Sequence, residues 1–300
     1  MTSVTPRQFD LALGELEPDS LAVASFSGTE HVGRPFRFAV TFGADPTVVG
    51  PPAALLGAPA RLVLQDGRGE ARRIQGIVSR LMLRAVEANG LAWYEVELVP
   101  RFSLGRRRRN SRVFQEQSVP DIAAVLFEEH GVRFEQRLLR RYEPRTYCVE
   151  YQETDFAFVT RLLSEEGIFY WFEDPPEGSG LDVGELLVIS DTPAGYRDVE
   201  ADAVLHFRGA TGLREAAATV EGFAGEVTLA PDAAEVRAFD FLRPELALRQ
   251  QARDEGAGPG RRPASRRARG VPLEMYDYRY DIEEAELSSW RAGSLLEGLR

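Results

Sequence analysis

The residues 147–174 read YCVEYQETDFAFVTRLLSEEGIFYWFED and constrain the fold more than any other stretch of the chain. Aromatic and β-branched residues predict a short strand over 147–151, followed by a turn through residues 152–153. Thr154 can accept a hydrogen bond from the free N–H groups of a following helix, and Asp155 suits the positive end of the helix dipole. A helix is therefore predicted to begin here.

The same stretch also predicts where the helix ends. Phe156, Val159 and Leu163 recur on one helical face. Gly167 follows as the stop, because a residue without Cβ adopts the left-handed conformation at little cost. The aromatic run 168–172 is too short for a second helix and predicts a buried strand. The unit is thus predicted to be a strand, a helix and a strand whose apolar faces pack together.

Acidic side chains are frequent in this unit, and any two of them could in principle form an acid and base pair. They are Glu150, Glu153, Asp155, Glu165, Glu166, Glu173 and Asp174. Asp155 has a role at the helix start, and Glu165 and Glu166 are expected on the polar side of the helix. We therefore predict structural roles for these carboxylates.

Composition excludes several classes of function. The 300 residues carry a formal net charge of −11, so general affinity for nucleic acid or for an anionic membrane is not expected. All 36 basic residues are arginine. Neither a phosphate-loop lysine nor a Schiff-base lysine is therefore available. The length and the 44% hydrophobic content indicate one large or two medium domains with a proper core.

The side chains that most often serve catalysis and metal binding are few. Cys148 lies in an apolar strand and is interpreted as a buried, inert thiol. His31, His130 and His206 are scattered, without the paired spacing of a metal site. Gly178–Gly180 is interpreted as a flexible turn. No residue is assigned as catalytic, cofactor-binding or metal-binding, and we expect no enzyme and no cofactor.

Targeting signals are equally sparse. No apolar run approaches the length of a membrane span, so membrane insertion by this portion is not expected. Residues 1–11 lack the apolar region of a signal peptide. We expect a protein that folds in the cytoplasm and leaves, if at all, through a dedicated machine.

Residues 1–112 are predicted to form a first barrel-like β domain. Strict alternation predicts four large side chains on one face of a strand: Phe36, Phe38, Val40 and Phe42. Asp66-Gly67 and Asn89-Gly90 are hairpin-type dipeptides between further alternating runs. Short strands joined by tight turns are typical of a small barrel or sandwich.

Residues 113–178 are predicted to form an α/β connector between two β domains. Ser118 can cap a helix, and Asp121 stands at the capping-box position. Gly131 is expected to end this helix. The strand-helix-strand unit completes the connector.

Residues 179–300 are predicted to form a second barrel-like domain. Its candidate strands are Leu186–Ile189, Val204–Phe207, Phe223–Leu229 and Val236–Phe241. Clustered Gly, Pro and Arg over 249–272 predict a loop. Together the three segments predict a mainly β (α+β) protein with two barrel-like domains bridged by an α/β segment.

Two arginine-rich segments could be read as phosphate-binding sites. The first is Arg106–Arg109, with Arg101 and Arg112 nearby, and the second lies between Arg261 and Arg269. Aromatic stacking partners are sparse and the chain is acidic overall. We therefore interpret the first as a solvated connection, or as ion pairs with an acidic neighbouring subunit, and the second as an exposed loop.

The run 147–170 resembles the signature of VgrG proteins, the spike and hub proteins of type VI secretion systems. Further pieces agree in order: Arg34–Phe38, Gly76–Val78, Ser111–Gln115, Asp240–Pro244 and Tyr276–Tyr278. In the family a Pro-Gly turn usually follows the last piece, whereas Arg279-Tyr280 stands here. The resemblance covers the chain from about Leu21 to its end.

The resemblance implies a structural function. VgrG-like hubs close as homotrimeric rings that join a hexameric tail-tube ring of Hcp-like proteins to the spike, and contact baseplate proteins, spike-tip proteins and effectors. It also implies cytoplasmic assembly followed by secretion through the contractile apparatus. Such chains normally continue into an OB-fold and a β-helical needle, whereas this sequence stops at Arg300. Three alternatives stay open: a truncated hub remnant, a phage tail hub, and a spike-delivered hydrolase.

Overall fold

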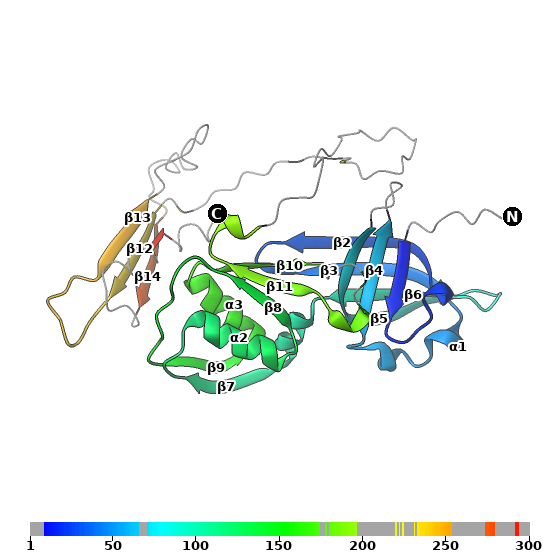
Figure 1. Cartoon of the computed structure of the whole chain (residues 1–300), viewed down its shortest axis with the longest axis horizontal. Coiled ribbons are helices and arrows are strands. Elements are labelled where there is room, and N and C mark those ends of the chain that lie inside the picture. The colour runs from blue at the N-terminus through cyan, green and yellow to red at the C-terminus, as the bar shows by residue number, and fades with distance from the viewer. Residues whose placement is uncertain are drawn as a thin grey trace.

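The computed structural model shows a mainly β protein, which confirms the predicted fold class (Figure 1). The described residues are 9–65, 71–174, 178, 180–196, 220, 222, 224, 231, 233–253, 274–279 and 292–293. They contain a six-stranded sheet, two three-stranded sheets and a two-stranded ribbon.

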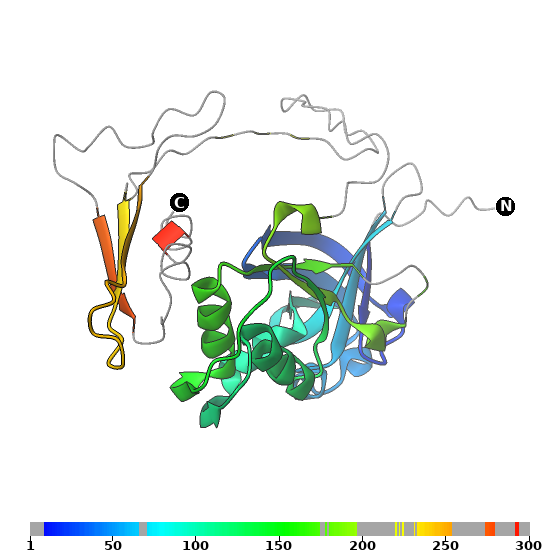
Figure 2. The same cartoon turned by 60° about the vertical axis from the view of Figure 1, so that its left-hand side comes forward.

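The first six strands form one antiparallel sheet in the order β1-β4-β5-β6-β3-β2. They are β1 (Phe9–Leu13), β2 (Ala22–His31), β3 (Arg34–Ala44), β4 (Pro59–Gln65), β5 (Ala71–Val86) and β6 (Ala92–Val99). The sheet curls, so that its strands enclose a core as a half barrel does (Figure 2). Short helical segments join them: Pro18–Ser20, α1 (Pro46–Val49) and Pro52–Leu55.

The alternation predicted for β3 is confirmed. Its four large side chains are buried in the core of the curled sheet: Phe36, Phe38, Val40 and Phe42. The Asn89-Gly90 turn is also confirmed, with Gly90 at φ +88° between β5 and β6. Asp66 and Gly67 lie outside the described residues, although the strands on either side of them pair.

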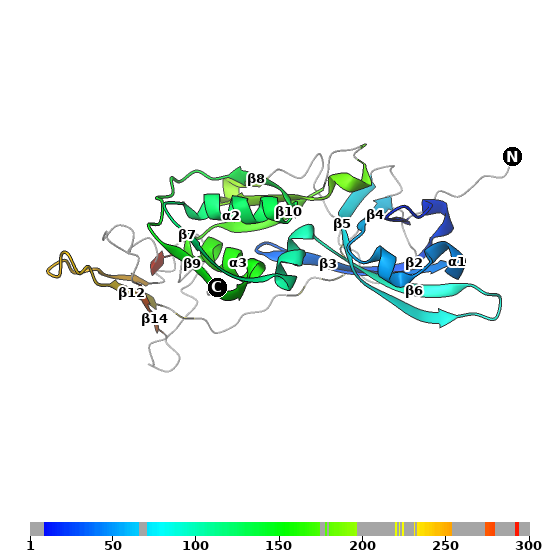
Figure 3. The same ribbon diagram turned by 90° about the horizontal axis from the view of Figure 1, so that it is seen from below.

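The β5–β6 hairpin extends beyond the rest of the curled sheet (Figure 3). β5 is 16 residues long, and its pairing with β6 is interrupted by two register shifts, between Val78 and Arg80 and between Leu83 and Ala85. Such bulges increase the local twist of a strand and turn it away from the plane of its sheet. We call residues 80–95 the arm.

The next part of the chain is an α/β unit. Its elements are a 3-10 helix (Arg101–Arg107), β7 (Arg109–Phe114), α2 (Val119–Glu129), β8 (Arg133–Arg137), β9 (Cys148–Thr154), α3 (Asp155–Glu165), β10 (Phe169–Glu173) and β11 (Leu186–Ser190). Single 3-10 turns lie at Leu181–Val183 and Pro193–Gly195. β10, β11 and β8 form a sheet, and β7 pairs with β9 as a ribbon. The two helices lie between sheet and ribbon (Figure 1).

The helix ends follow the local sequence. Ser118 and Asp121 form the predicted capping box of α2, and the Thr154 hydroxyl accepts from Ala157 N–H at the start of α3. Gly131 and Gly167, just beyond the two helices, have φ of +63° and +61°. These four predictions are confirmed.

The strand before α3 is longer than predicted. β9 continues through residues 152–153, where a turn was expected, and reaches Thr154. Gln152 takes φ +50°, and the register with β7 shifts between Asn110 and Ser111. This bulge absorbs the irregular residue, so the ladder continues instead of ending.

Both predicted domain boundaries fall inside the α/β unit. The division at 112 falls within β7, and the division at 178 falls between the paired strands β10 and β11. The strand expected at Leu186–Ile189 is present, but it lies between β10 and β8 because β8 offers it a parallel partner. The division into three domains stays a prediction.

The last described sheet has the order β13-β12-β14, with β12 (Ala233–Ala238), β13 (Arg249–Arg253) and β14 (Glu274–Arg279). β12 runs antiparallel to β13 and parallel to β14. The strand expected at Val236–Phe241 thus begins and ends three residues earlier. Two other expected strands lie outside the described residues, Val204–Phe207 entirely and Phe223–Leu229 apart from residue 224.

The loop predicted over 249–272 is wrong at its start, because residues 249–253 form β13. Glu235 on β12 explains why so polar a segment pairs there. Its carboxylate accepts from Arg249 Nη2 at 2.8 Å and from Gln251 Nε2 at 2.5 Å. These cross-strand contacts supply the stabilisation that apolar residues usually give a strand. The arginines between 261 and 269 lie outside the described residues.

The curled sheet and the α/β unit meet at a joint of aromatic and backbone contacts. Phe36 of β3 packs edge-on against Phe172 of β10, with ring centroids 5.4 Å apart. Gly33 N–H donates to the Tyr170 carbonyl at 2.7 Å. The Gln75 amide, buried on β5, donates to the carbonyls of Gly180 and Leu181 at 3.0 and 2.8 Å.

Candidate functional site

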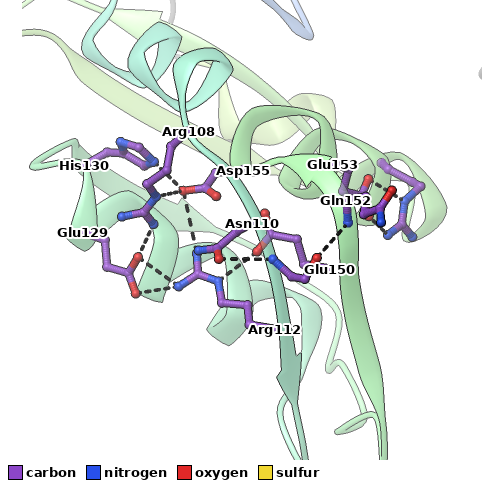
Figure 4. Close-up of polar contacts among 11 residues, drawn as sticks. Arg108, Asn110, Arg112, Glu129, His130, Glu150, Gln152, Glu153 and Asp155 are labelled. Atoms are coloured by element: carbon purple, nitrogen blue, oxygen red, sulfur yellow. Dashed lines mark hydrogen bonds and ion pairs between the residues drawn. The ribbon is translucent and has the colours of Figure 1, made fainter.

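Six charged or titratable side chains converge where the ribbon meets the two helices (Figure 4). We call them the ionic cluster: Arg108, Arg112, Glu129, His130, Glu150 and Asp155. Arg108 immediately precedes β7 and Arg112 lies on it, Glu129 and His130 end α2, Glu150 lies on β9, and Asp155 opens α3. The cluster therefore ties both strands of the ribbon, β7 and β9, to both helices, α2 and α3.

Asp155 lies at the centre of the ionic cluster and is fully buried. Its Oδ2 accepts from Arg108 Nε and lies 2.7 Å from His130 Nε2 and 3.7 Å from Arg112 Nη2. Burial opposes ionisation, but the hydrogen bonds with His130 and Arg108 act against it, and the pKa of Asp155 is held below its usual range. Asp155 is thus an ionised carboxylate, with a larger role than the predicted one at the helix start.

Glu150 is the second fully buried carboxyl group. Its Oε2 accepts from Arg112 Nε at 2.8 Å. Burial raises the pKa of Glu150, and the adjacent Asp155 carboxylate raises it further against the lowering effect of Arg112. Two neighbouring carboxyl groups thus have pKa values displaced in opposite directions.

Glu129 closes the exposed side of the ionic cluster. It accepts from Arg112 Nη1 at 2.9 and 3.0 Å and from Arg108 Nη2. Burial acts against its charge, yet the two arginines together keep the pKa of Glu129 below its usual range. Both arginines are therefore neutralised within the chain.

The interpretation of Arg106–Arg109 as a solvated connection is confirmed for its three exposed residues, Arg106, Arg107 and Arg109, and is wrong for Arg108, which forms ion pairs within the chain. Arg108 belongs to the ionic cluster, and the Arg106 guanidinium carbon lies 4.1 Å from the centroid of the Phe156 ring. Arg109 Nε donates to the Gln152 carbonyl at 2.7 Å. Partners within the chain already engage these arginines, which leaves little for a phosphate.

Glu165 and Glu166 are not simply on the polar side of α3. Both pair with Arg145, at 3.0 and 2.7 Å, and Glu166 is buried. Glu165 and Glu166 therefore have structural roles, as expected, but they fill them through ion pairs that the sequence did not indicate. Glu185, another buried acid that went unnoticed, accepts from Arg101 N–H at 2.5 Å.

The other candidates for chemistry lie apart. Cys148 is buried on β9, and burial raises the pKa of its thiol. His31 lies exposed on β2, and His206 lies outside the described residues. Within the described part of the chain, no group of three or more His, Cys, Asp or Glu residues could hold a metal ion. Nor does any described helix have the length and apolar character needed to cross a membrane.

The geometry of the ionic cluster suits a structural role better than a catalytic one. An acid and base pair needs contact with a substrate, whereas Glu150 and Asp155 are both fully buried. Their polar contacts are with Arg108, Arg112 and His130 of the same chain. The cluster can hold elements together, and its two buried carboxyl groups are closed to solvent.

Comparison with known proteins confirms the resemblance seen in the sequence. The family described as phage tail baseplate hub (GPD) matches residues 29–300. The type VI secretion system spike protein VgrG1c of Pseudomonas aeruginosa is 37% identical over 186 residues, 61% of this chain and 25% of that protein. VgrG4b of the same organism is 32% identical over 292 residues, 95% of this chain. The chain spans about a quarter of the first relative and a third of the second.

Solved structures agree with this assignment. The E. coli c3393 protein, described as a component of the type VI secretion system, is 28% identical, with a TM-score of 0.54 over 63% of this chain and 50% of that one. A tail protein from Neisseria meningitidis shares the fold alone, at 12% identity and a TM-score of 0.57 over 98% and 78% of the two chains. The sequence match, the curled sheet and the α/β unit place this chain in the phage tail baseplate hub (GPD) family.

Proposed function

We propose that this chain is the hub portion of a spike in a contractile injection machine of the type VI secretion kind. The observation that carries the proposal is the family match over 29–300, together with 32–37% identity to spike proteins named for that system. In this proposal the chain acts by assembly and not by catalysis. Its partners are further copies of itself, a tail-tube ring, baseplate proteins and the proteins carried at the spike tip.

The proposed assembly is a trimeric ring that joins the tube to the spike. Three copies, each with two barrel-like domains, would present six similar surfaces to a hexameric tube ring. Closed cyclic symmetry requires complementary patches on the two sides of each copy. The protein would be assembled in the cytoplasm and expelled with the apparatus.

Native mass by light scattering over a concentration series tests the assembly proposal. A mass of three chains is expected at high concentration, with dissociation on dilution. A single-chain mass at every concentration would contradict closure of the ring by this portion. Addition of a purified tail-tube protein to the same sample then tests whether the ring binds a tube.

Within this proposal the arm is a contact between copies. It extends beyond the curled sheet (Figure 3), and it carries two large apolar side chains, Leu83 and Val86, that are 53% and 59% exposed. Its charged groups are already paired across the strands, since Glu95 accepts from both Arg80 and Arg84. The apolar residues near the tip are thus the part of the arm that lacks a partner surface within the described chain.

Replacement of Leu83 and Val86 by aspartate is expected to shift the protein from trimer toward monomer. Complete burial of one such side chain is worth about 1.5–3 kcal/mol. Leu83 and Val86 are each about half exposed in the single chain, so covering the pair contributes roughly that amount in total, and the double variant should weaken association by about tenfold or more. The readout is native mass over the same concentration series. The thermal midpoint should stay nearly unchanged when parent and variant are both compared at a dilution where they are monomeric, because both positions are exposed in the single chain.

A matched control uses the same substitutions at positions away from the arm. Val32 and Leu139 are exposed to 53% and 77%, and their replacement by aspartate adds the same charge. This variant should associate like the parent. Equal loss of association in both double variants would show that added charge, and not the arm, is responsible.

A further inference from the structure

The ionic cluster contains two buried oxygens without a hydrogen-bond donor. They are Glu150 Oε1 and Asp155 Oδ1, one on each of the fully buried carboxyl groups. The other oxygen of each group is engaged: Oε2 of Glu150 by Arg112, and Oδ2 of Asp155 by Arg108 and His130. A buried acceptor without a donor costs about 1–3 kcal/mol, and more when it is charged. Two such oxygens in adjacent groups therefore require an explanation.

The net charge of the ionic cluster also indicates that one proton is missing. The charged and titratable groups facing the carboxyl pair are Arg108, before β7, Arg112 from β7, and Glu129 and His130 from the end of α2. Two guanidinium groups stand against three carboxylates, which leaves one negative charge in excess when His130 is neutral. Addition of one proton makes the cluster neutral.

We propose that Glu150 keeps a proton at neutral pH and donates it from Oε1 to Oδ1 of Asp155, which makes the pair a built-in proton-binding site that fastens β9 to α3. One proton on Glu150 Oε1 gives Asp155 Oδ1 the hydrogen-bond donor that it lacks. The same proton makes the Glu150 side chain neutral, so that its buried Oε1 no longer carries charge. It also balances the two arginines against two remaining carboxylates. Carboxyl pairs that share a site cannot both ionise at ordinary cost.

The position of the proton follows from the donors around each group. Asp155 Oδ2 is approached by Arg108, His130 and Arg112, whereas Glu150 Oε2 accepts from Arg112 alone. Asp155 has more donors around it and is therefore the group that stays ionised, whereas Glu150 holds the proton. A proton on His130 instead would balance the charge but would leave both oxygens without a donor, because the imidazole is directed to Oδ2.

The pair has a defined dependence on pH. Because the pKa of Glu150 is raised on folding above its ordinary 4.5, its contribution to stability is complete below that value and is lost as pH rises through the folded pKa. The pKa of Asp155 is lowered from 3.8, so its contribution is present above 3.8 and is lost as pH falls through the folded pKa. Stability from the pair is thus greatest when it holds one proton.

Infrared spectroscopy of the folded chain in D2O tests the proposal directly. A protonated carboxylic acid gives a C=O band that a carboxylate lacks. We expect such a band at about pH 7, and we expect its loss in Glu150→Gln. The glutamine amide can donate to Asp155 and accept from Arg112, so this variant should fold and should lose less stability than the parent as the pH is raised.

Two further samples assign the band to one residue. Glu185→Gln removes the other buried glutamate of the described chain whose pKa burial raises, and it should keep the band, whereas loss of the band in this variant would assign it to Glu185. Labelling the parent with ¹³C-glutamate should shift the band, which together with Glu185→Gln assigns it to Glu150 even if Glu150→Gln fails to fold. Absence of the band from the parent, its persistence in folded Glu150→Gln, or its failure to shift on labelling would overturn the proposal.

Discussion

Replacement of Asp155 by alanine is expected to lower the free energy of unfolding by about 3–5 kcal/mol, the typical cost of removing one partner from a buried ion pair. Asp155 is fully buried, and its side chain satisfies Arg108 and His130 and contributes to the field around Arg112. The variant leaves these donors desolvated without their anion. Urea denaturation followed by circular dichroism measures the change.

Asp10→Ala is the matched control for this prediction. Asp10 lies on β1 and accepts one exposed hydrogen bond, from Gln65 Nε2 at 3.1 Å. Its loss should cost no more than about 0.5–1 kcal/mol. A loss for Asp155→Ala as small as that of the control would contradict a central role for Asp155 in holding α3 to its neighbours.

Replacement of Phe102 by alanine is expected to cost a similar amount, about 3–5 kcal/mol, through a cavity in the α/β unit. Phe102 is fully buried, and its ring centroid lies 5.0 Å from that of Phe127 and 4.9 Å from that of Phe156. It also contacts Tyr170 edge-on, at 6.1 Å. One side chain thus joins both helices to β10.

The same substitution at an exposed position provides the comparison. Phe241 is 85% exposed beyond the end of β12, so Phe241→Ala should change the free energy of unfolding by within about 0.5 kcal/mol. Both variants are measured by urea denaturation at one pH. Equal effects would show that the packing around Phe102 is loose enough to collapse into the space.

The parts of the fold that the sequence predicted correctly are those encoded within a few residues. Ser118 and Asp121 are three apart and form the capping box of α2, and Gly131 and Gly167 follow the helix ends in left-handed backbone. The alternation in β3 likewise describes one strand by itself. Such signals need no knowledge of the rest of the chain.

The candidate site was not predictable in this way. Arg108 and Asp155 are 47 residues apart, and Arg112 and Glu150 are 38 apart. Alone, Asp155 indicates a helix start and the two arginines indicate a solvated connection, and only the pairing of β7 with β9 brings these residues together. The bulge at Gln152 hid the length of β9, and β11 was assigned to the following domain because its parallel partner, β8, lies far back in the chain.

The joint between the curled sheet and the α/β unit has a mechanical consequence. It combines an aromatic contact, Phe36 with Phe172, a backbone hydrogen bond from Gly33, and a buried side chain, Gln75, that donates to two carbonyls. These contacts differ in kind and lie at separate points, so bending at the joint would break several at once. A load applied to the arm would therefore be transmitted to the helices with little compliance, as in a single stiff body.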